Sequence, residues 1–221
     1  LINKLNGKQI GGMGDEVSKL CYPFQVPGTH DTYRPRVAYS EGLPVQPMTR
    51  RNHFYDAGNG LVIFLGQEPW FRIDVYAEAF FQAVTALGSP KIIAVEGYNG
   101  AAPPEMERSV SCIYSRADMK DDLDKYGLRY SNYGSQSRSG PTIAMALVTL
   151  AHYEHSELQM LRMGAMAPMY PFLTSNTDPV GINRDHRALY DIMRRLKAIF
   201  ALDIDLSALL SLGDTESPDL V

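Results

Sequence analysis

Two apolar runs decide the fold of this sequence: LVIFL at residues 61–65 and KIIAV at residues 91–95. Short uninterrupted apolar runs of this kind are typical of strands that are covered on both faces. Between them, apolar side chains recur from Ile73 to Leu87 at the i, i+3, i+4 spacing of an amphipathic helix, which Gly88 ends. Strand, helix and strand in this order predict a right-handed crossover, so we expect the two runs to be neighbouring parallel strands.

The alternation of strands and helices continues toward the C-terminus. Apolar patterns predict strands at 109–114 and 158–166 and helices at 116–126, 141–151 and 184–202. Ser115 is the expected cap of the first of these helices, and Gly127 its stop. The order is typical of an α/β fold, and we expect a three-layer α/β/α sandwich with a mostly parallel mixed sheet. We interpret residues 1–212 as a single domain and residues 213–221 as a loose polar tail.

The first 58 residues give short extended pieces that Gly and Pro interrupt. Leu1, Ile2 and Leu5 share one helical face, and Gly7 follows as a C-cap, so the opening has the pattern of a helix tail. From this we expect that a strand and the start of that helix are missing from the beginning of the sequence. Residues 36–40 and 45–48 are interpreted as a hairpin that turns through Glu41-Gly42.

Composition restricts the classes of partner. The net charge is −4 with a pI of about 5.7, and there is no basic run that would favour nucleic acid or an anionic membrane. No apolar run approaches the ~20 residues that span a bilayer. The two cysteines, Cys21 and Cys112, lie far apart and suit a reducing compartment. We therefore expect a cytoplasmic protein with neither a nucleic-acid nor a membrane partner.

Polar residues follow each of the two apolar runs. Glu68 and Pro69 come after the first run, and Glu96 and Gly97 after the second. Because ligands bind beyond the C-terminal ends of parallel strands, these four residues mark a candidate pocket or interaction edge. Two neighbouring carboxylates could raise one another's pKa and divide acid and base roles. Alternatively, each glutamate binds only nearby loop amides, and the spacing does not decide between the two.

A loop rich in small and hydroxyl residues, YGSQSRSG at 133–140, precedes a predicted helix start. Its amides and its arginine could hold an anion at the positive end of that helix. The alternative is an ordinary loop with a helix cap, because such residues commonly form loops. The candidate residues here are Tyr133, Ser137, Arg138 and Ser139.

Recognisable catalytic and metal-binding patterns are missing from the sequence. It contains no Gly-x-Ser-x-Gly elbow and no Cys-x-x-Cys pair. His152 and His155 lie three apart at a helix end without a third ligand, and Cys112 lies mid-strand with no nearby histidine. We therefore predict no catalytic residue, no metal and no cofactor. Methionines at 160, 163, 166 and 169 are expected in the core, with an adaptable binding surface as the alternative.

Several stretches in succession resemble the proteasome assembly chaperone 2 family, of which this would be a prokaryotic member. They are YRPRV at 33–37, LGQEP at 65–69, the strand, turn and helix at 110–126 that ends in KYG, SGP at 139–141, APMYP at 167–171, and a closing helix before LDIDL at 202–206. Their order covers most of the chain.

The resemblance implies a three-layer fold similar to nucleoside phosphorylases and related hydrolases, and it implies homo-oligomers, with a trimer favoured. The sequence departs from the family in two places. It ends Asp219-Leu220-Val221 without the tyrosine of the tail by which some members dock on proteasome rings, so such docking is not expected. The family's Pro-His-Thr-Arg-Pro stretch reads PPEMERS at 103–109, so no role of that stretch is carried over.

The family-like order of motifs and the absent catalytic patterns together predict a non-catalytic, protein-binding or assembly-chaperone-like protein that acts as a homo-oligomer. Its protein partner is not identified by the sequence. The alternative is an enzyme or small-ligand-binding protein of phosphorylase-like or hydrolase-like fold, with its site around Glu68, Glu96 and the loop at 133–140. Folds host many functions, so that alternative rests on analogy alone.

Overall fold

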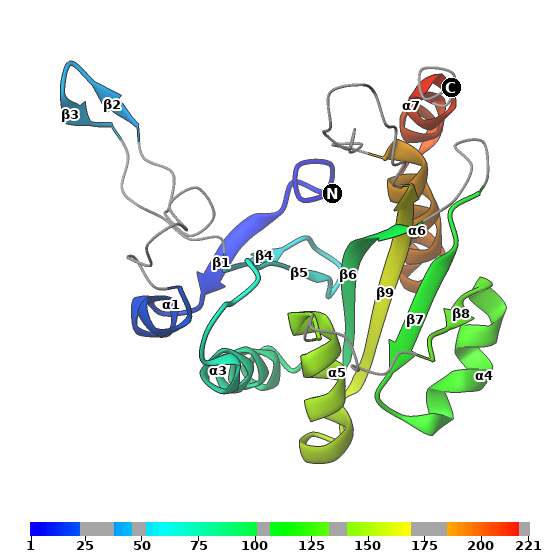
Figure 1. Cartoon of the computed structure of the whole chain (residues 1–221), viewed down its shortest axis with the longest axis horizontal. Helices are drawn as coiled ribbons and strands as arrows, with labels where there is room; N and C mark the ends of the chain where they lie inside the picture. Colours follow the sequence, from blue (N-terminus) through cyan, green and yellow to red (C-terminus); the bar gives the residue numbers. More distant parts are fainter. Residues whose placement is uncertain (23–37, 46–51, 101–106, 133–140, 169–184, 217–221) are drawn as a thin grey trace, which may run out of the picture. The chain divides into compact units, whose positions relative to one another are not determined.

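A computed structural model describes residues 1–22, 38–45, 52–100, 107–132, 141–168 and 185–216. The chain divides into two compact units, Leu1–Ser89 and Pro90–Val221. In Figure 1 the first unit is coloured blue to cyan-green and the second green to red. The unit boundary falls directly after the loop that follows the predicted helix at 73–87.

The first unit is built on an antiparallel sheet of order β1-β4-β5. Its strands are β1 (Lys8–Gly12), β4 (His53–Asp56) and β5 (Val62–Leu65), and its main helices are α1 (Asp15–Cys21) and α3 (Ile73–Ala86). Phe54 and Phe64 are paired in register across β4 and β5, with ring centroids 4.5 Å apart, and Phe80 of α3 packs 5.4 Å from Phe64. This aromatic stack joins the helix to the sheet, as the apolar stripe at 73–87 predicts.

The expected parallel pairing of the two apolar runs is wrong. β5 pairs antiparallel with β4, whereas the run at 91–95 lies in β6 (Lys91–Gly100), which pairs parallel with β9 (Gln159–Pro168) in a separate sheet. The reason is the tight turn before β5, in which Gly58, Asn59 and Gly60 all have positive φ. That turn makes a local hairpin of β4 and β5, and an apolar run does not itself specify its partner strand. Most residues of both runs are half-buried rather than fully covered.

The second unit contains a mixed sheet of order β6-β9-β7-β8. β6 and β9 are parallel over their whole length, from Lys91↔Gln159 to Gly100↔Pro168. β7 (Val110–Tyr114) is antiparallel to β9 and parallel to the short β8 (Arg129–Tyr130). The α/β class with a mixed sheet is therefore confirmed.

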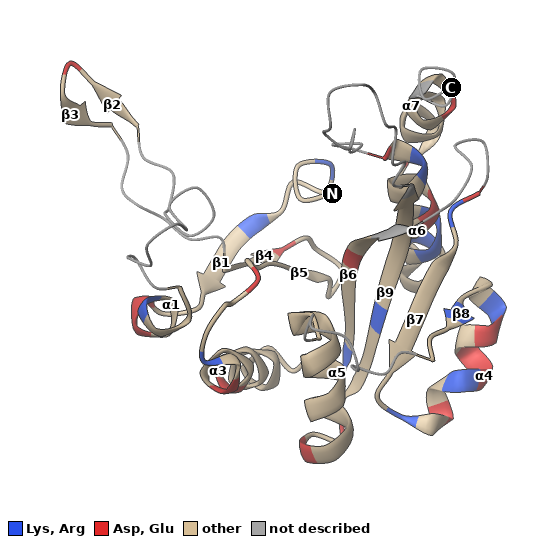
Figure 2. Ribbon diagram, in the orientation of Figure 1, with Lys and Arg blue, Asp and Glu red and all other residues tan. Residues whose placement is uncertain are grey.

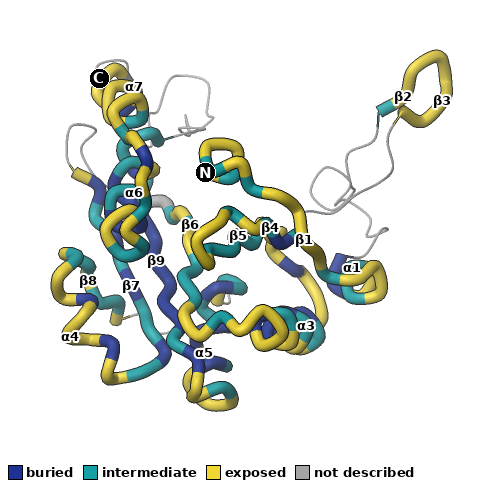
Figure 3. The backbone as a smooth tube through the Cα atoms, turned by 180° about the vertical axis from the view of Figure 1, so that it is seen from behind, coloured by how far each residue is buried: buried dark blue, intermediate teal, exposed yellow. Residues whose placement is uncertain are grey.

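Helices cover both faces of this second sheet. α5 (Ile143–Glu154) lies on one face, and α6 (His186–Phe200) and α4 (Lys120–Leu123) lie on the other, as the opposite views of Figures 1 and 3 show. Side chains of β9 alternate between the faces. The buried core on the α6 side consists of Val110, Cys112, Met119, Leu123, Leu161, Met163, Ala165, Ala188, Ile192 and Leu196. Within this unit, the predicted three-layer arrangement is confirmed, and Met160 and Met163 are buried as expected.

The helix predicted at 116–126 is divided into three short turns. They are η1 (Ala117–Met119), α4 and η2 (Asp124–Tyr126), and Gly127 ends the last with φ 60°. Ser115 does not cap them, which corrects the prediction. Its hydroxyl instead donates to Leu158 O (3.2 Å) and accepts the Met160 N–H (2.9 Å), because the residue lies beside the first residues of β9.

The C-terminal boundary drawn at residue 212 falls inside a helix, α7 (Ser207–Glu216). The Asp205 carboxylate accepts the Ser207 N–H (2.9 Å) at its start. A Cβ at Gly213 would lie 2.8 Å from Arg187 Cγ, so this glycine lets α7 approach α6 closely. Residues 213–216 were expected in a tail because the end of the sequence is polar. Residues 217–221 lie outside the described part.

Two small features of the first unit match the sequence pattern with shifted positions. The hairpin exists as β2 (Tyr39–Ser40) and β3 (Leu43–Pro44), turning through Glu41 and Gly42 with φ 49° and 83°. The opening residues form a helix-end motif in which Gly7 N–H donates to Ile2 O (2.9 Å), but Asn6, not Gly7, has the left-handed conformation. Among all helices in the described ranges, none has the length and apolar character needed to cross a membrane.

Candidate functional site

The loop between β5 and α3, residues 66–72, contains two of the candidate residues. Its backbone is fixed by buried groups. The Asn52 side chain accepts the Gln67 N–H at Oδ1 (2.9 Å) and donates through Nδ2 to the Tyr22 hydroxyl (3.1 Å), which itself donates to Gln67 O (2.7 Å). Farther along, Cys21 O accepts the N–H groups of Trp70 (3.2 Å) and Phe71 (3.3 Å). Two segments distant in sequence, the end of α1 at residues 21–22 and Asn52 before β4, therefore hold this loop in one conformation.

The side chains of this loop divide between core and solvent. Pro69 is buried and Glu68 is exposed. Trp70 and Phe71 are each 51% exposed although their backbone is anchored. The buried Tyr76 lies beneath the loop. Its pKa is raised, foremost by burial and further by the neighbouring Tyr22 and Glu68 groups. Sequence analysis selected Glu68 and Pro69 but missed the aromatic pair, whose signal is two large rings directly after a loop proline.

Glu96 and Gly97 lie in β6 of the second unit, and Glu96 is bound inside the sheet layer. Its carboxylate forms an ion pair with Arg162 of β9, whose side chain is only 4% exposed. Arg162 Nη1 also donates to Ser111 Oγ (2.9 Å). The guanidinium lies across Gly164, where a Cβ would come within 2.4 Å of it. Glu96 therefore has an arginine as its direct partner, and its proposed proximity to Glu68 stays a prediction.

The remaining candidates, Tyr133, Ser137, Arg138 and Ser139, lie outside the described residues. The helix that follows them, α5, begins at Thr142, whose Oγ1 accepts the Met145 N–H (3.3 Å). This threonine is an N-cap residue, so its side chain supplies a hydrogen-bond acceptor for one of the free N–H groups at the helix start.

A larger charged cluster, which sequence analysis did not select, surrounds the N-terminal half of α6. Arg108 is buried and pairs with Asp185 (2.8 Å), the N-cap residue of α6. Asp191 accepts the Arg108 N–H (2.8 Å) and Arg194 Nε (2.8 Å), and it faces Arg195 Nη1 at 3.7 Å. Figure 2 shows the charges concentrated on α4 and α6, whereas most of β7 and β9 is uncharged. Charged residues on a helix are usually solvated, so their sequence gave no sign of burial.

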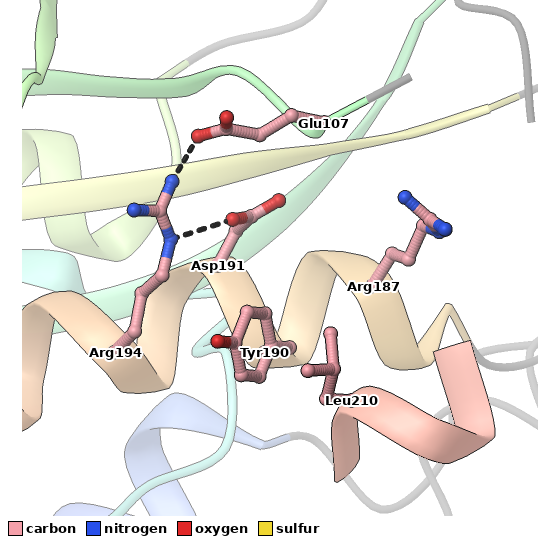
Figure 4. A pocket seen from close by; sticks show the side chains of 6 residues that line it. All are labelled: Glu107, Arg187, Tyr190, Asp191, Arg194 and Leu210. Carbon is pink, nitrogen blue, oxygen red and sulfur yellow. Dashed lines mark hydrogen bonds and ion pairs between the residues drawn. The ribbon is translucent and has the colours of Figure 1, made fainter. Parts of the chain in front are cut away.

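The outer side of this cluster opens into a pocket of about 240 Å³. Figure 4 shows it lying along α6, with α7 closing one side. It is lined by Glu107, Arg187, Tyr190, Asp191, Arg194 and Leu210. Two arginines, two carboxylates and two side chains with apolar surface thus meet in one concave site.

The possible metal ligands of the described residues are the next feature of the fold. Across the described ranges, no three His, Cys, Asp or Glu side chains are grouped as a metal site. His152 Nδ1 lies 2.6 Å from Ser115 O, and His155 faces Glu157 at 3.8 Å, so each histidine of the HYEH stretch has a separate local contact.

Burial raises the pKa of the Cys112 thiol from 9.0 to about 11. A thiol whose pKa is raised on folding stabilises the protein fully below pH 9.0, and this contribution is lost as the pH rises toward 11. Cys21 is also buried and its pKa is raised. We therefore expect neither thiol to react with an aromatic disulfide reagent at pH 8 until denaturant unfolds the chain. Rapid labelling of the native protein would contradict the buried placement.

The mixed sheet and its helices place the second unit among α/β proteins. The sequence profile of the PAC2 family matches residues 1–214, so the chain belongs to the PAC2 family. This confirms the resemblance found from the motif order. Among curated proteins, none matches the chain.

Solved structures of the same fold come from bacteria and archaea. A PAC2 family protein from Streptomyces avermitilis has a TM-score of 0.76 and 17% identity, over 99% of this chain and 84% of that one. A proteasome-assembly chaperone homologue from Mycobacterium tuberculosis has a TM-score of 0.75 and 13% identity, over 99% and 84%. PbaB of Pyrococcus furiosus, an archaeal proteasome activator, has a TM-score of 0.62 and 15% identity, over 99% and 83%.

Proposed function

We propose that this chain is a non-catalytic, homo-oligomeric protein that binds other proteins in the manner of an assembly chaperone. Family membership supports the class, and two similar structures are described as a proteasome-assembly chaperone homologue and a proteasome activator. The observation that carries the proposal for this chain is the loop at 66–72, whose backbone is anchored while Trp70 and Phe71 face solvent.

This loop has the properties of a protein-binding hot spot. Large aromatic side chains contribute most of the energy at interfaces, and tryptophan is strongly enriched among hot-spot residues. Ordering a flexible loop on binding costs free energy, and the hydrogen bonds from Asn52, Tyr22 and Cys21 have already ordered this one. The charged groups of the second unit support a non-catalytic role. Glu96, Arg108 and Asp191 are each engaged by other parts of the chain in ion pairs or hydrogen bonds.

The proposed partner is another protein in the cytoplasm, in addition to further copies of this chain, with a trimer favoured. Native mass spectrometry of the purified chain, combined with affinity isolation from its source cell, tests this. We expect a closed oligomer and a defined co-purifying protein. A strict monomer that captures nothing would contradict the proposal. Stabilisation by a metabolite in a thermal-shift screen, without any protein partner, would favour the small-ligand alternative.

Replacing Trp70 and Phe71 by alanine should weaken association roughly 30-fold or more, because truncating a hot-spot side chain costs about 2 kcal/mol or more. Trp70 is the only tryptophan, so its fluorescence reports directly on this surface. We expect its emission to shift to shorter wavelength when the wild-type chain is concentrated into its oligomer or mixed with its partner. The matched control is Tyr153→Ala, since Tyr153 is a 78% exposed aromatic residue on α5. Equal effects of the two replacements would contradict a special role of the loop.

A further inference from the structure

The pocket beside α6 carries two arginines that face outward at a fixed spacing. Arg187, Tyr190 and Arg194 lie on one face of α6, at positions i, i+3 and i+7, and Leu210 of α7 lies opposite. Figure 4 shows Tyr190 and Leu210 close together between the two arginines. Seven helical residues correspond to a rise of about 10 Å, which is the distance along the helix from one arginine position to the other.

Each of the two arginines forms an ion pair with an exposed carboxylate. Arg194 binds the buried Asp191 through Nε (2.8 Å), while its Nη2 pairs with Glu107, which is 64% exposed. Arg187 Nη2 pairs with Asp214 (2.7 Å), which is 57% exposed. Ion pairs with such exposed carboxylates are weak, so an incoming carboxylate can take their place without disturbing Asp191.

The size of the pocket indicates what kind of group enters it. Its volume of about 240 Å³ is below the roughly 300–1,000 Å³ typical of small-molecule and cofactor sites. It is therefore suited to a side chain of a peptide that continues across the surface. Tyr190 and Leu210 supply an apolar wall for that side chain, and the arginines supply charge on either side.

We propose that this pocket binds an acidic segment of a partner protein, which deepens and rests on the proposed function. An apolar side chain of the segment packs against the wall formed by Tyr190 and Leu210, and the carboxylates of the segment replace Asp214 and Glu107 as partners of Arg187 and Arg194. A segment in the polyproline II conformation has three residues per turn and advances about 3.1 Å per residue, so two acidic residues three positions apart lie on the same side and span about 9 Å, close to the ~10 Å between the arginine positions. The recognised pattern is thus a stretch of four residues. Its first and fourth residues are acidic, and one of the two residues between them is apolar.

An array of capped octapeptides, probed with the full-length protein, tests the pattern directly. Positions 3 and 6 are varied through all residue types, and positions 4 and 5 through apolar and polar ones. We expect the strongest binding for Asp or Glu at both outer positions with an apolar residue between them. Arg187→Gln should reduce binding of the best peptide about 10-fold, because it removes a charge-assisted hydrogen bond. Leu210→Asp should reduce it as well, by placing a carboxylate on the apolar wall.

The matched control is Arg116→Gln, which removes an arginine of similar exposure, also ion-paired and in the same unit, but not among the residues lining the pocket. It should leave peptide binding unchanged. Selection of basic or uncharged peptides, no selection at all, or equal binding by Arg187→Gln and the wild type would overturn the pocket proposal. If the wild type nevertheless forms its oligomer and captures its partner, the proposed function stands and only the pocket is wrong.

Discussion

The Asp191→Ala variant should lose about 3–5 kcal/mol of its free energy of unfolding, because removing one partner of a buried ionic network leaves the others uncompensated. The Asp191 side chain is only 6% exposed, and it accepts the Arg108 N–H and Arg194 Nε. Burial, together with the neighbouring Arg194 charge, already lowers the pKa of Arg195, and Asp191 opposes that effect. Without this carboxylate, the Arg108 N–H and Arg194 Nε lose their acceptor, and the buried Arg195 loses a nearby negative charge.

Urea unfolding followed by circular dichroism measures the loss, with the midpoint and slope fitted separately. The control is Asp118→Ala, which removes the 55% exposed carboxylate paired with Arg116 at 2.6 Å. That change should leave the free energy of unfolding nearly unchanged, because an exposed ion pair is screened by solvent. If both variants lose the same small amount, the Asp191 network does not hold α6 to the start of β7.

Gly164→Ala should lower the free energy of unfolding by about 2–4 kcal/mol, because the new methyl overpacks the site and displaces a buried charge. The new methyl would meet the Arg162 guanidinium at 2.4–2.6 Å, closer than such contacts allow. Arginine side chains are usually flexible enough to move away. This one is buried and bound to Glu96 and Ser111, so moving it breaks the ion pair inside the layer between the sheet and α5.

Gly97→Ala provides the comparison within the same sheet. Gly97 lies on the neighbouring strand, and a Cβ built there meets no atom within 4 Å. Its replacement should therefore be close to neutral, or slightly stabilising through the lower entropy of the unfolded chain. Similar midpoints for Gly164→Ala and the wild type would show that Arg162 repacks without cost, and the buried pair would then not constrain this position.

The positions of elements were largely predictable from the sequence, whereas strand partners were not. The runs at 61–65 and 91–95 are both strands, because periodicity and apolar content are local properties. Their neighbours were predicted wrongly, since the turn at Gly58–Gly60 pairs β5 with β4. The strand at 53–56 has two polar ends and was not recognised. The last four residues of α7 were expected in a polar tail, whereas in the structure Gly213 lets this helix approach α6 closely.

The candidate site shows the same division. Glu68 and Pro69 lie on the anchored loop as their place after a strand predicted, but the exposed aromatic residues beside them were not selected. Glu96 was predicted to follow the strand at 91–95, but it lies inside β6, which continues to Gly100. Its partner Arg162 comes from β9, 66 residues farther along the chain. Arg162 is a charged residue within an apolar strand, and that exception was the available signal. Asp191 on α6 and Arg108 just before β7 carried none, because the burial of a charged residue depends on tertiary packing.

The Asn52 amide joins residues that belong to three different parts of the first unit. A change in the length of the loop would break bonds to a helix end and to a strand start at once, so insertions there would be poorly tolerated. Substitution of the rings at 70 and 71 would disturb none of these bonds. Under the proposed function, partner choice can therefore diverge, or be redesigned, by exchanging two outward-facing side chains on an unchanged backbone.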